Sequence, residues 1–277
     1  MPTVNLELES RPESVVVVRG VLAGVADLFE FDRELLHNLK TVVSEACNNV
    51  VLHAYDDHTG RLVVSLEIGE EGVEAVVRDW GRGIREVAPS EDRLHVGLAV
   101  ISAVADRAQF LRAPDGGTEV RMTFTGQHVP GAGGSISDDG REQPAMPLSG
   151  EAIARLSPVG LLAAVLTRIA TALAARARFS LDRFCDVYLV TDAIAAHAVP
   201  AAVGDRVGFA AATGEHRLEL TVGPFRAGSG LELRGREGLG HLGTALALLA
   251  VELVVEPVDG VEMWRLVVMD SNGAGVR

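Results

Sequence analysis

The sequence predicts an α+β fold that occurs twice along one chain. Short segments with alternating apolar residues indicate strands with one buried face, and longer segments with apolar residues every three to four positions indicate helices. Both kinds of segment occur on either side of residues 126–150, which are rich in Gly, Ser and Pro. A chain of 277 residues is long enough for two domains. We therefore expect domains at residues 1–125 and 151–277, joined by a flexible linker at 126–150.

The first half shows these periodicities in the order strand, two helices, two strands, helix, two strands. The predicted strands cover residues 4–8, 62–68, 73–78, 108–112 and 118–124, and the predicted helices cover residues 13–29, 32–53 and 97–106. The second half shows the same order with lower polarity.

Four short matches between the halves predict a tandem duplication. They are FDR at 31–33 with LDR at 181–183, SEA at 44–46 with TDA at 191–193, HVGLAVI at 95–101 with HLGTALA at 241–247, and PDGGTEV at 114–120 with VDGVEMW at 258–264. Each match alone is weak, because Gly and small apolar residues recur by chance. Four matches in the same order and at similar spacing indicate a repeated unit.

The composition restricts the possible function classes. The formal net charge is −13, from 25 Lys and Arg against 38 Asp and Glu. A nucleic-acid binder needs clustered basic residues, so nucleic acid is not expected as a direct partner. No run of about 18 apolar residues is free of charge, and the first ten residues, MPTVNLELES, lack the features of a signal peptide. We therefore expect a cytoplasmic protein that does not enter a membrane.

The two cysteines, Cys47 and Cys185, are far apart and neither belongs to a CxxC pair. This spacing indicates neither a disulfide framework nor a zinc site, so we expect both to be small core residues.

The helix predicted at residues 32–53 has two chemically different sides. At about 100° per residue, one side carries Glu45, Asn48, Asn49 and His53, and the opposite side carries Val43, Cys47, Val50 and Ala54. The polar side is either a solvated surface or a face that contacts a ligand. Asparagines in place of Lys and Arg favour a ligand or a hydrated metal, because amides bind both but are only moderate helix formers.

Three further segments carry polar groups or glycines at predicted element ends. In RDWGRGI, Asp79 leaves a strand and is followed by Gly81 and Gly83, so the backbone can turn sharply while the carboxylate accepts from an exocyclic amine. Gly97 opens an apolar helix whose first amides could receive a phosphate. A Gly-Gly-Thr turn at 116–118 separates two strands. The alternative for the first and third segments is an ordinary turn.

The order ExxxN, HAY, DxGxG, Gly-Leu and GGT resembles the GHKL ATP-binding fold of histidine kinases and gyrase. The segment SEACNNVVLHAY and the short length of the lid segment of this fold are most similar to bacterial anti-sigma-factor serine kinases. The resemblance covers about residues 4–125. It implies a two-layer α/β sandwich, with a mixed sheet covered by helices on one face, and ATP and Mg²⁺ as cofactors.

The resemblance also implies roles for individual residues. Asn49 would be the Mg²⁺ ligand, Glu45 would orient or deprotonate the attacking hydroxyl, and Asp79 would read adenine. The remaining implied positions are Gly81 and Gly83 at the adenine pocket, Gly97 and Leu98 near the phosphates, and Thr118 behind the adenine. These roles agree with the chemistry of phosphoryl transfer, which needs positioning, a metal and a base.

The first half departs from the family pattern at one position. His95 stands where the second glycine box of the family has its first glycine. A histidine there either donates to the phosphates when protonated or narrows the loop. His53, in HAY, is expected to pack or cap locally.

The second half departs further from the family pattern. Asp192 stands at the place of Glu45, but Ala196 stands at the place of Asn49. The segment GPFRAGSG at 223–230 replaces RDWGRG and has no carboxylate, and only Gly240 and Gly243 persist as scaffold glycines. We expect a degenerate copy that keeps the fold and has lost nucleotide binding.

Two functions remain open. One is an ATP-dependent serine/threonine kinase that binds a sigma factor and phosphorylates a STAS-type antagonist. The other is a non-catalytic, nucleotide-responsive module that binds a protein partner.

The first helix of each half is apolar nearly all round, in SVVVVRGVLAGVADLF at 14–29 and VGLLAAVLTRIATALAA at 159–175. We expect the two halves to pair through these helices in a monomeric pseudo-dimer. The alternative is that each helix is buried in the core of its own domain.

Overall fold

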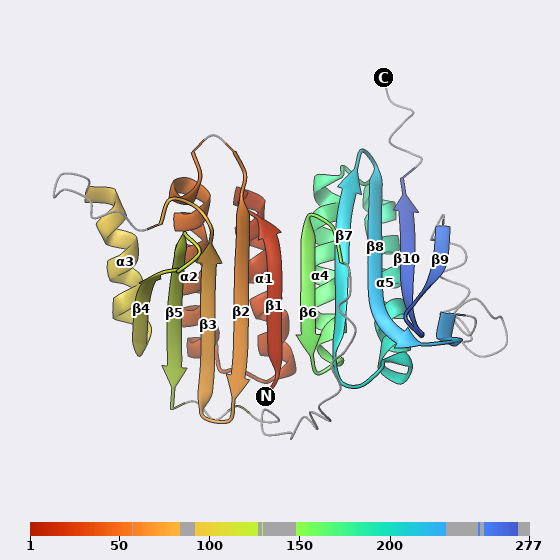
Figure 1. The fold of residues 1–277 in the computed structure, drawn as a ribbon, viewed down its shortest axis with the longest axis horizontal. Coiled ribbons are helices and arrows are strands. Elements are labelled where there is room, and N and C mark those ends of the chain that lie inside the picture. The colour runs from red at the N-terminus through yellow and green to blue at the C-terminus, as the bar shows by residue number, and fades with distance from the viewer. Residues whose placement is uncertain are drawn as a thin grey trace. The chain divides into compact units, whose positions relative to one another are not determined.

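The computed structural model describes residues 1–56, 58–83, 92–126, 129, 148–230, 249 and 252–270, without the side chains of 92–96 (Figure 1). The chain divides into two compact units, Met1–Ser135 and Ile136–Arg277. Most of the predicted linker lies outside the described residues. Within them, no helix has both the length and the apolar character needed to span a bilayer.

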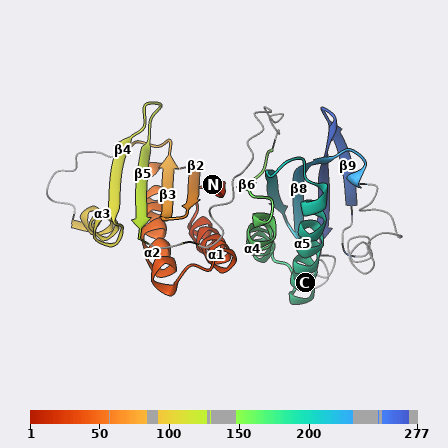
Figure 2. The same cartoon turned by 90° about the horizontal axis from the view of Figure 1, so that it is seen from below.

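The first unit has the predicted order of elements. These are β1 (Thr3–Glu9), α1 (Pro12–Leu28), α2 (Arg33–Asn49), the π-helical turn η1 (Val50–Ala54), β2 (Arg61–Gly69), β3 (Gly72–Asp79), α3 (Asp92–Val104), β4 (Arg107–Arg112) and β5 (Thr118–Thr125). The strands lie in the order β4-β5-β3-β2-β1. Figure 2 shows α1, α2 and α3 on one face of this sheet, so the two-layer α+β architecture is confirmed.

The strand directions differ from those that the resemblance implied. The pairs β1–β2, β2–β3, β3–β5 and β4–β5 are all antiparallel, so the sheet of this unit is not mixed. The short connections between β2 and β3 and between β4 and β5 form hairpins, and the two strands of a hairpin are necessarily antiparallel. Burial alternates along β1 and β3, as expected for strands with one face toward helices.

The helix α2 begins and ends differently from a uniform helix over 32–53. Asp32 caps its start, where the carboxylate accepts from the Leu35 amide at 2.7 Å. The α-helical pattern stops at Asn49 and continues as the wider π-helical turn η1. The predicted apolar side, with Val43, Cys47, Val50 and Ala54, is buried. Val50, His53 and Ala54 lie in η1, where the α-helical periodicity of about 100° no longer applies, and the His53 side chain is exposed.

The cysteine prediction is half confirmed. Cys47 is fully buried, and burial raises the pKa of its thiol to about 12, so it is an inert core residue. Cys185 is exposed on the outer side of α5, so its assignment to the core was wrong. The helix buries another side there, with Val187 and Val190 fully covered.

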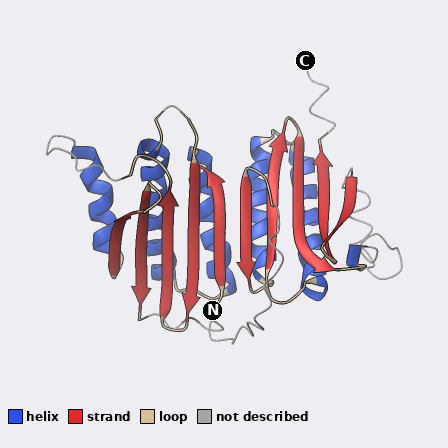
Figure 3. Cartoon of the chain, viewed as in Figure 1, coloured by secondary structure: helices blue, strands red, loops and turns tan. Residues whose placement is uncertain are grey.

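The second unit repeats the topology of the first. Its elements are β6 (Ala152–Ser157), α4 (Leu161–Arg176), α5 (Leu181–Ala201), β7 (Val207–Gly214), β8 (Arg217–Arg226), β9 (Glu252–Val258) and β10 (Val261–Met269). The strand order β6-β7-β8-β10-β9 corresponds to β1-β2-β3-β5-β4. Its described ladders are antiparallel as well. Figure 3 shows the two helices α4 and α5 behind the strands of this unit.

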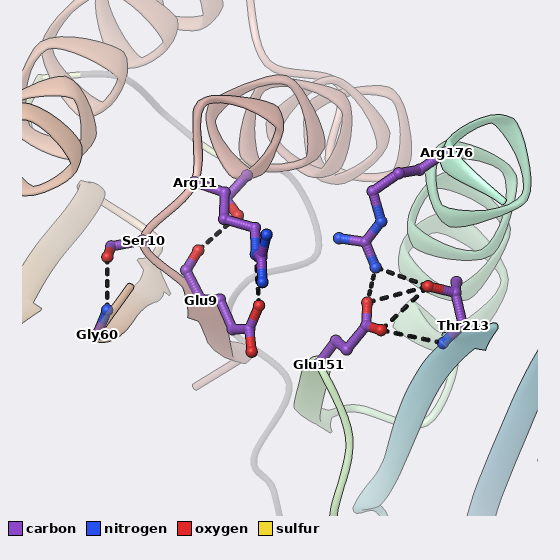
Figure 4. Close-up of polar contacts among 8 residues, drawn as sticks. Glu9, Ser10, Arg11, Gly60, Glu151, Arg176 and Thr213 are labelled. Carbon is purple, nitrogen blue, oxygen red and sulfur yellow. Dashed lines mark hydrogen bonds and ion pairs between the residues drawn. The ribbon is translucent and has the colours of Figure 1, made fainter. Parts of the chain in front are cut away.

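Polar contacts close strand ends within each unit (Figure 4). In the first unit, the backbone amide of Gly60 donates to Ser10 Oγ at 2.8 Å, and the Ser10 amide donates to the Gly60 carbonyl at 2.8 Å. In the second unit, the Glu151 carboxylate pairs with Arg176 and accepts from the Thr213 hydroxyl at 3.0 Å. These bonds fix β1 to β2 in one unit and β6 to α4 and β7 in the other.

Candidate functional site

The carboxylate of Asp79 is the centre of the candidate site. It lies at the end of β3 and is only 3% exposed. Its Oδ1 accepts from the Gly81 amide at 2.8 Å, and Thr118 lies close enough to lower the pKa of the carboxyl. A carboxylate offers about four lone-pair positions, so Asp79 can accept from a further donor, such as an amine, in addition to the Gly81 amide.

Burial raises the pKa of Asp79, and the hydrogen bonds from Gly81 and Thr118 oppose this effect only in part. A raised carboxyl pKa in a site with fixed donors is typical of functional positions, although structural networks produce it too. The structure therefore brings together Asp79, Gly81 and Thr118, three of the residues predicted for the adenine end.

Glycines allow three backbone segments to meet around Asp79. A Cβ added at Gly81 would lie 2.0 Å from the carbonyl oxygen of Ala54 in η1. A Cβ added at Gly117, which has φ +82°, would lie 2.1 Å from the carbonyl oxygen of Asp79 itself. Gly83, with φ +75°, lies next to the carbonyl of Gly117. Since any side chain at Gly81 or Gly117 would collide with backbone, only glycine permits the packing at these two positions.

Gly117 was missed as a site residue by the sequence analysis. The GGT turn was identified, but only Thr118 received a role. The available signal was the second glycine itself, because an ordinary turn between two strands needs fewer glycines than this one has.

The polar side of α2 forms the second part of the site. Glu45 and Asn49 are partly buried, one helical turn apart, and Asn48 is exposed. A Cβ added at Gly97 of α3 would lie 2.2 Å from Glu45 Oε1, so Gly97 lets the α3 backbone approach this carboxylate. Within the described residues, the side chains of Glu45 and Asn49 form no hydrogen bond or ion pair.

The start of α3 corrects one expectation. The helix begins at Asp92, not at Gly97, so Gly97 is its sixth residue. Only the first four amides of a helix lack an intrahelical partner, so the Gly97 amide is not a free phosphate donor in this conformation. Leu98 follows it, half-buried. The side chain of His95, expected near the phosphates, lies outside the described residues.

The two parts of the site are joined by η1. The chain leaves α2 just after Asn49, and the carbonyl oxygens of His53 and Ala54 then accept from Arg82 at 3.2 and 2.9 Å. His53 itself is exposed, so its side chain does not pack locally as expected, and it contributes through its backbone carbonyl. The end of η1 thus rests on the loop that follows Asp79.

The candidate site offers a metal ion one amide ligand, the side chain of Asn49. Within the described residues, no group of three or more His, Cys, Asp and Glu side chains could hold a metal ion. Mg²⁺ usually keeps several waters and binds substrate phosphates with one or two protein oxygens, so the Asn49 side chain fits a magnesium ion that arrives with a nucleotide.

Residues 8–124 match the family model described as the histidine kinase-like ATPase domain. The first unit thus resembles a histidine kinase-like ATPase domain over most of its length, and we refer to it as the ATPase domain. It has the GHKL fold, and its match includes every site residue discussed above. The matched range lies wholly within the first unit.

Curated relatives of this ATPase domain are serine-protein kinases. The chain is 28% identical over 134 residues to serine-protein kinase RsbW of Bacillus cereus, with 43% of this chain and 82% of that protein covered. It is 36% identical over 80 residues to RsbW of Bacillus licheniformis, with 28% of this chain and 50% of that protein covered. A crystal structure of the RsbU and RsbW domains of Rv1364c from Mycobacterium tuberculosis matches with 23% identity and a TM-score of 0.38. That match covers 46% of this chain and 33% of the crystallised chain.

The second unit has different residues at the equivalent positions. The β2–β3 turn pairs Gly69 with Gly72, and the β7–β8 turn pairs Gly214 with Arg217. Counting along β3 and β8 from these turns places Pro224 where the ATPase domain has Asp79. Counting along β10 and β5 from the residues opposite Arg217 and Gly72 places Glu262 where it has Thr118. The β8–β10 register shifts by one residue between Glu262 and Trp264, so Glu262 pairs with Phe225 and not with Pro224.

Side chains of the second unit fill this region. The Glu262 carboxylate accepts from the amides of Gly228 and Gly230 at 2.6 and 2.8 Å. Burial alone would raise the pKa of Glu262, but these hydrogen bonds lower it overall. The rings of Phe225 and Trp264 are fully buried and stack at 3.8 Å between centroids. Gly240 and Gly243 lie outside the described residues.

Proposed function

We propose that the first unit binds ATP with Mg²⁺ and transfers the γ-phosphoryl group to a serine or threonine of a protein. The observation that carries this proposal is the buried Asp79 carboxylate, which is held by the Gly81 amide and can accept from a further donor. Such an acceptor suits the exocyclic amine of adenine, because a guanine presents a carbonyl oxygen there and two acceptors repel. The similarity to serine-protein kinases supports the same reaction.

Each residue of the ATPase domain has a distinct task in this proposal. Asp79 orients the base, with Gly81 and Gly83 allowing the close approach of the backbone. Asn49 would hold Mg²⁺, which when bound offsets the negative charge of the phosphates. Glu45, one helical turn earlier, accepts the proton of the attacking hydroxyl, because its carboxylate has no fixed partner among the described residues.

The protein partners follow from the family resemblance. We propose a sigma factor as the bound regulator and a STAS-type antagonist as the phosphorylated substrate, both in the cytoplasm. A non-catalytic, nucleotide-responsive binding module is the second candidate. It is favoured by the contact between Glu45 and the α3 backbone at Gly97, which leaves the carboxylate close to a helix in this conformation.

Labelled ATP separates the two candidates. The chain is incubated with γ-labelled ATP and the STAS-type protein encoded nearest to it, and transfer is followed with time. Glu45→Gln keeps the shape of the side chain and removes its charge, so transfer should fall about 100-fold while ATP affinity stays nearly unchanged. Glu34→Gln, an exposed change on the same helix, is the matched control and should transfer at the wild-type rate.

Two outcomes of this assay would contradict the kinase proposal. An unchanged rate in Glu45→Gln removes the proposed base. ATP binding by the wild type without transfer to any candidate partner favours the binding module.

We further propose that the second unit is a degenerate duplicate of the first. Its support is the shared strand order together with Pro224 and Glu262 at the positions of Asp79 and Thr118. A proline has no acceptor side chain, and the Glu262 carboxylate is already bonded to Gly228 and Gly230.

A further inference from the structure

Tyr55 of the HAY segment has no role in the site described so far. It is the first residue after η1, and its side chain is half-buried. The Tyr55 hydroxyl donates to the carbonyl oxygen of Arg61 at 2.6 Å and accepts from the backbone amide of Trp80 at 3.0 Å. One hydroxyl thus connects the start of β2 with the residue directly after Asp79.

The ring of Tyr55 is fixed by its surroundings. A Cβ added at Gly60 would lie 2.1 Å from the ring, so the glycine leaves the space that the ring occupies. The His58 ring approaches it edge-on at 5.5 Å between centroids. Burial raises the pKa of the hydroxyl, and the nearby charge of Asp79 acts in the same direction. The hydroxyl therefore stays protonated at neutral pH and can serve both bonds.

A second contact joins the same two segments. The Arg82 amide donates to the Ala54 carbonyl at 2.9 Å, and its guanidinium pairs with Asp56 at 2.5 Å. The loop after Asp79 is therefore held on both sides of Gly81, at Trp80 by the tyrosine and at Arg82 by η1. The turn η1 follows directly after Asn49, the last residue of α2, so these contacts connect the loop after Asp79 with the helix that carries Asn49.

The second unit shows that the fold does not need this hydroxyl. Ala202 is the first residue after α5, as Tyr55 is the first residue after η1. Ala202 forms a backbone bridge with Phe225, which counting from the β7–β8 turn places at the position of Trp80. The Arg226 guanidinium donates to the Pro200 carbonyl at 2.8 Å. The junction between helix end and strand end therefore exists there with an alanine, in the unit without the adenine acceptor.

We propose that Tyr55 is a positioning residue for the nucleotide, whose hydroxyl sets the loop at Asp79 relative to the helix that carries Asn49 and Glu45. This inference rests on the proposed ATP site. ATP spans both parts, since its base needs Asp79 and its phosphates with Mg²⁺ need Asn49. A loop with more freedom offers the base acceptor in the right place less often, and this lowers affinity without removing any group that touches ATP.

The test is Tyr55→Phe in the full chain, with Tyr188→Phe as the matched control. Tyr188 is the only other tyrosine, and it is 58% exposed on α5. Phenylalanine keeps the ring and leaves the Trp80 amide and the Arg61 carbonyl without their partner. We expect the Kd for Mg-ATP, measured by calorimetry well below the melting temperature, to rise about tenfold in Tyr55→Phe and to stay unchanged in Tyr188→Phe.

Melting temperature separates a positioning role from a structural one. A purely structural tyrosine would lower the melting temperature and leave the Kd unchanged, and that result overturns the proposal. If the wild type binds no Mg-ATP, both the ATP site and the role of Tyr55 are wrong. If the wild type binds and Tyr55→Phe binds equally well, only the role of Tyr55 is wrong.

Discussion

The turn between β4 and β5 offers a direct test of the packing around Asp79. Gly116 and Gly117 are adjacent and both have positive φ, +97° and +82°. A Cβ added at Gly116 meets nothing within 4 Å, whereas a Cβ added at Gly117 would lie 2.1 Å from the Asp79 carbonyl oxygen and 2.7 Å from Trp80 Cα. The same substitution at two neighbouring positions therefore differs in this contact alone.

The expected magnitudes follow from these distances. Alanine in a left-handed conformation costs about 1–2 kcal/mol, so Gly116→Ala should lower the free energy of unfolding by that amount. Gly117→Ala carries the same cost and must also move the Asp79 carbonyl by about 1 Å, since both colliding groups are backbone. Overpacking of this kind adds about 1–3 kcal/mol. A displacement of about 1 Å in a binding group can cost up to ~100-fold, so we expect ATP affinity to fall ten- to hundredfold in Gly117→Ala only.

Urea unfolding gives the stabilities of both variants, and calorimetric titration with Mg-ATP gives their affinities. The reasoning is refuted if both variants bind ATP with the same Kd, because the packing of Gly117 against Asp79 would then have no effect on the site. Equal losses of stability in the two variants would refute the collision with the Asp79 backbone.

Three more predictions concern the nucleotide and the assembly. Wild-type chain should titrate with one Mg-ATP per chain and Asp79→Asn with none detectable, because asparagine can turn a donor toward the adenine amine; two equivalent sites would contradict a degenerate second unit. ATP affinity should decline as the pH falls through the raised pKa of Asp79, and this decline should begin at a higher pH than for an ordinary aspartate. The contribution of Asp79 to the free energy of unfolding should instead be lost as the pH rises through the same pKa. An ATP affinity that is constant across the acid range contradicts the expected decline. The chain should be monomeric, with a mass by light scattering near 29.2 kDa, and twice this mass contradicts the intramolecular pseudo-dimer.

Local patterns in the sequence were sufficient for most elements of the fold. Short apolar segments located all five strands of the first unit, and in β1, β3 and most of β5 the burial alternates as expected for a strand with one face toward the core. The order ExxxN, HAY, DxGxG and GGT identified Asp79, Gly81 and Thr118, which the structure brings together. Such motifs are readable because one chemistry needs a few residue types at short, constant spacing.

Helix ends were harder to predict than helix interiors. The polar pattern over 32–53 gave no sign that α2 widens into η1 after Asn49. The apolar run at 97–106 likewise hid the start of α3 at Asp92. The periodicity of apolar residues shows which side of a helix is buried. That buried side can end at a different residue from the backbone hydrogen bonds that define the helix.

Contacts between distant segments were decided only by the tertiary structure. Glycine at 117 is required by the carbonyl of Asp79, and the hydroxyl of Tyr55 bonds to the amide of Trp80 and the carbonyl of Arg61. No periodicity relates these positions, because the partners come from different strands and turns. The strand directions were decided in the same way, since antiparallel pairing depends on which strands become neighbours and each strand's own sequence is compatible with either direction. The sequence by itself therefore determined which groups the ATPase domain carries, and the packing of η1, β3 and the β4–β5 turn decided how Asp79 is held.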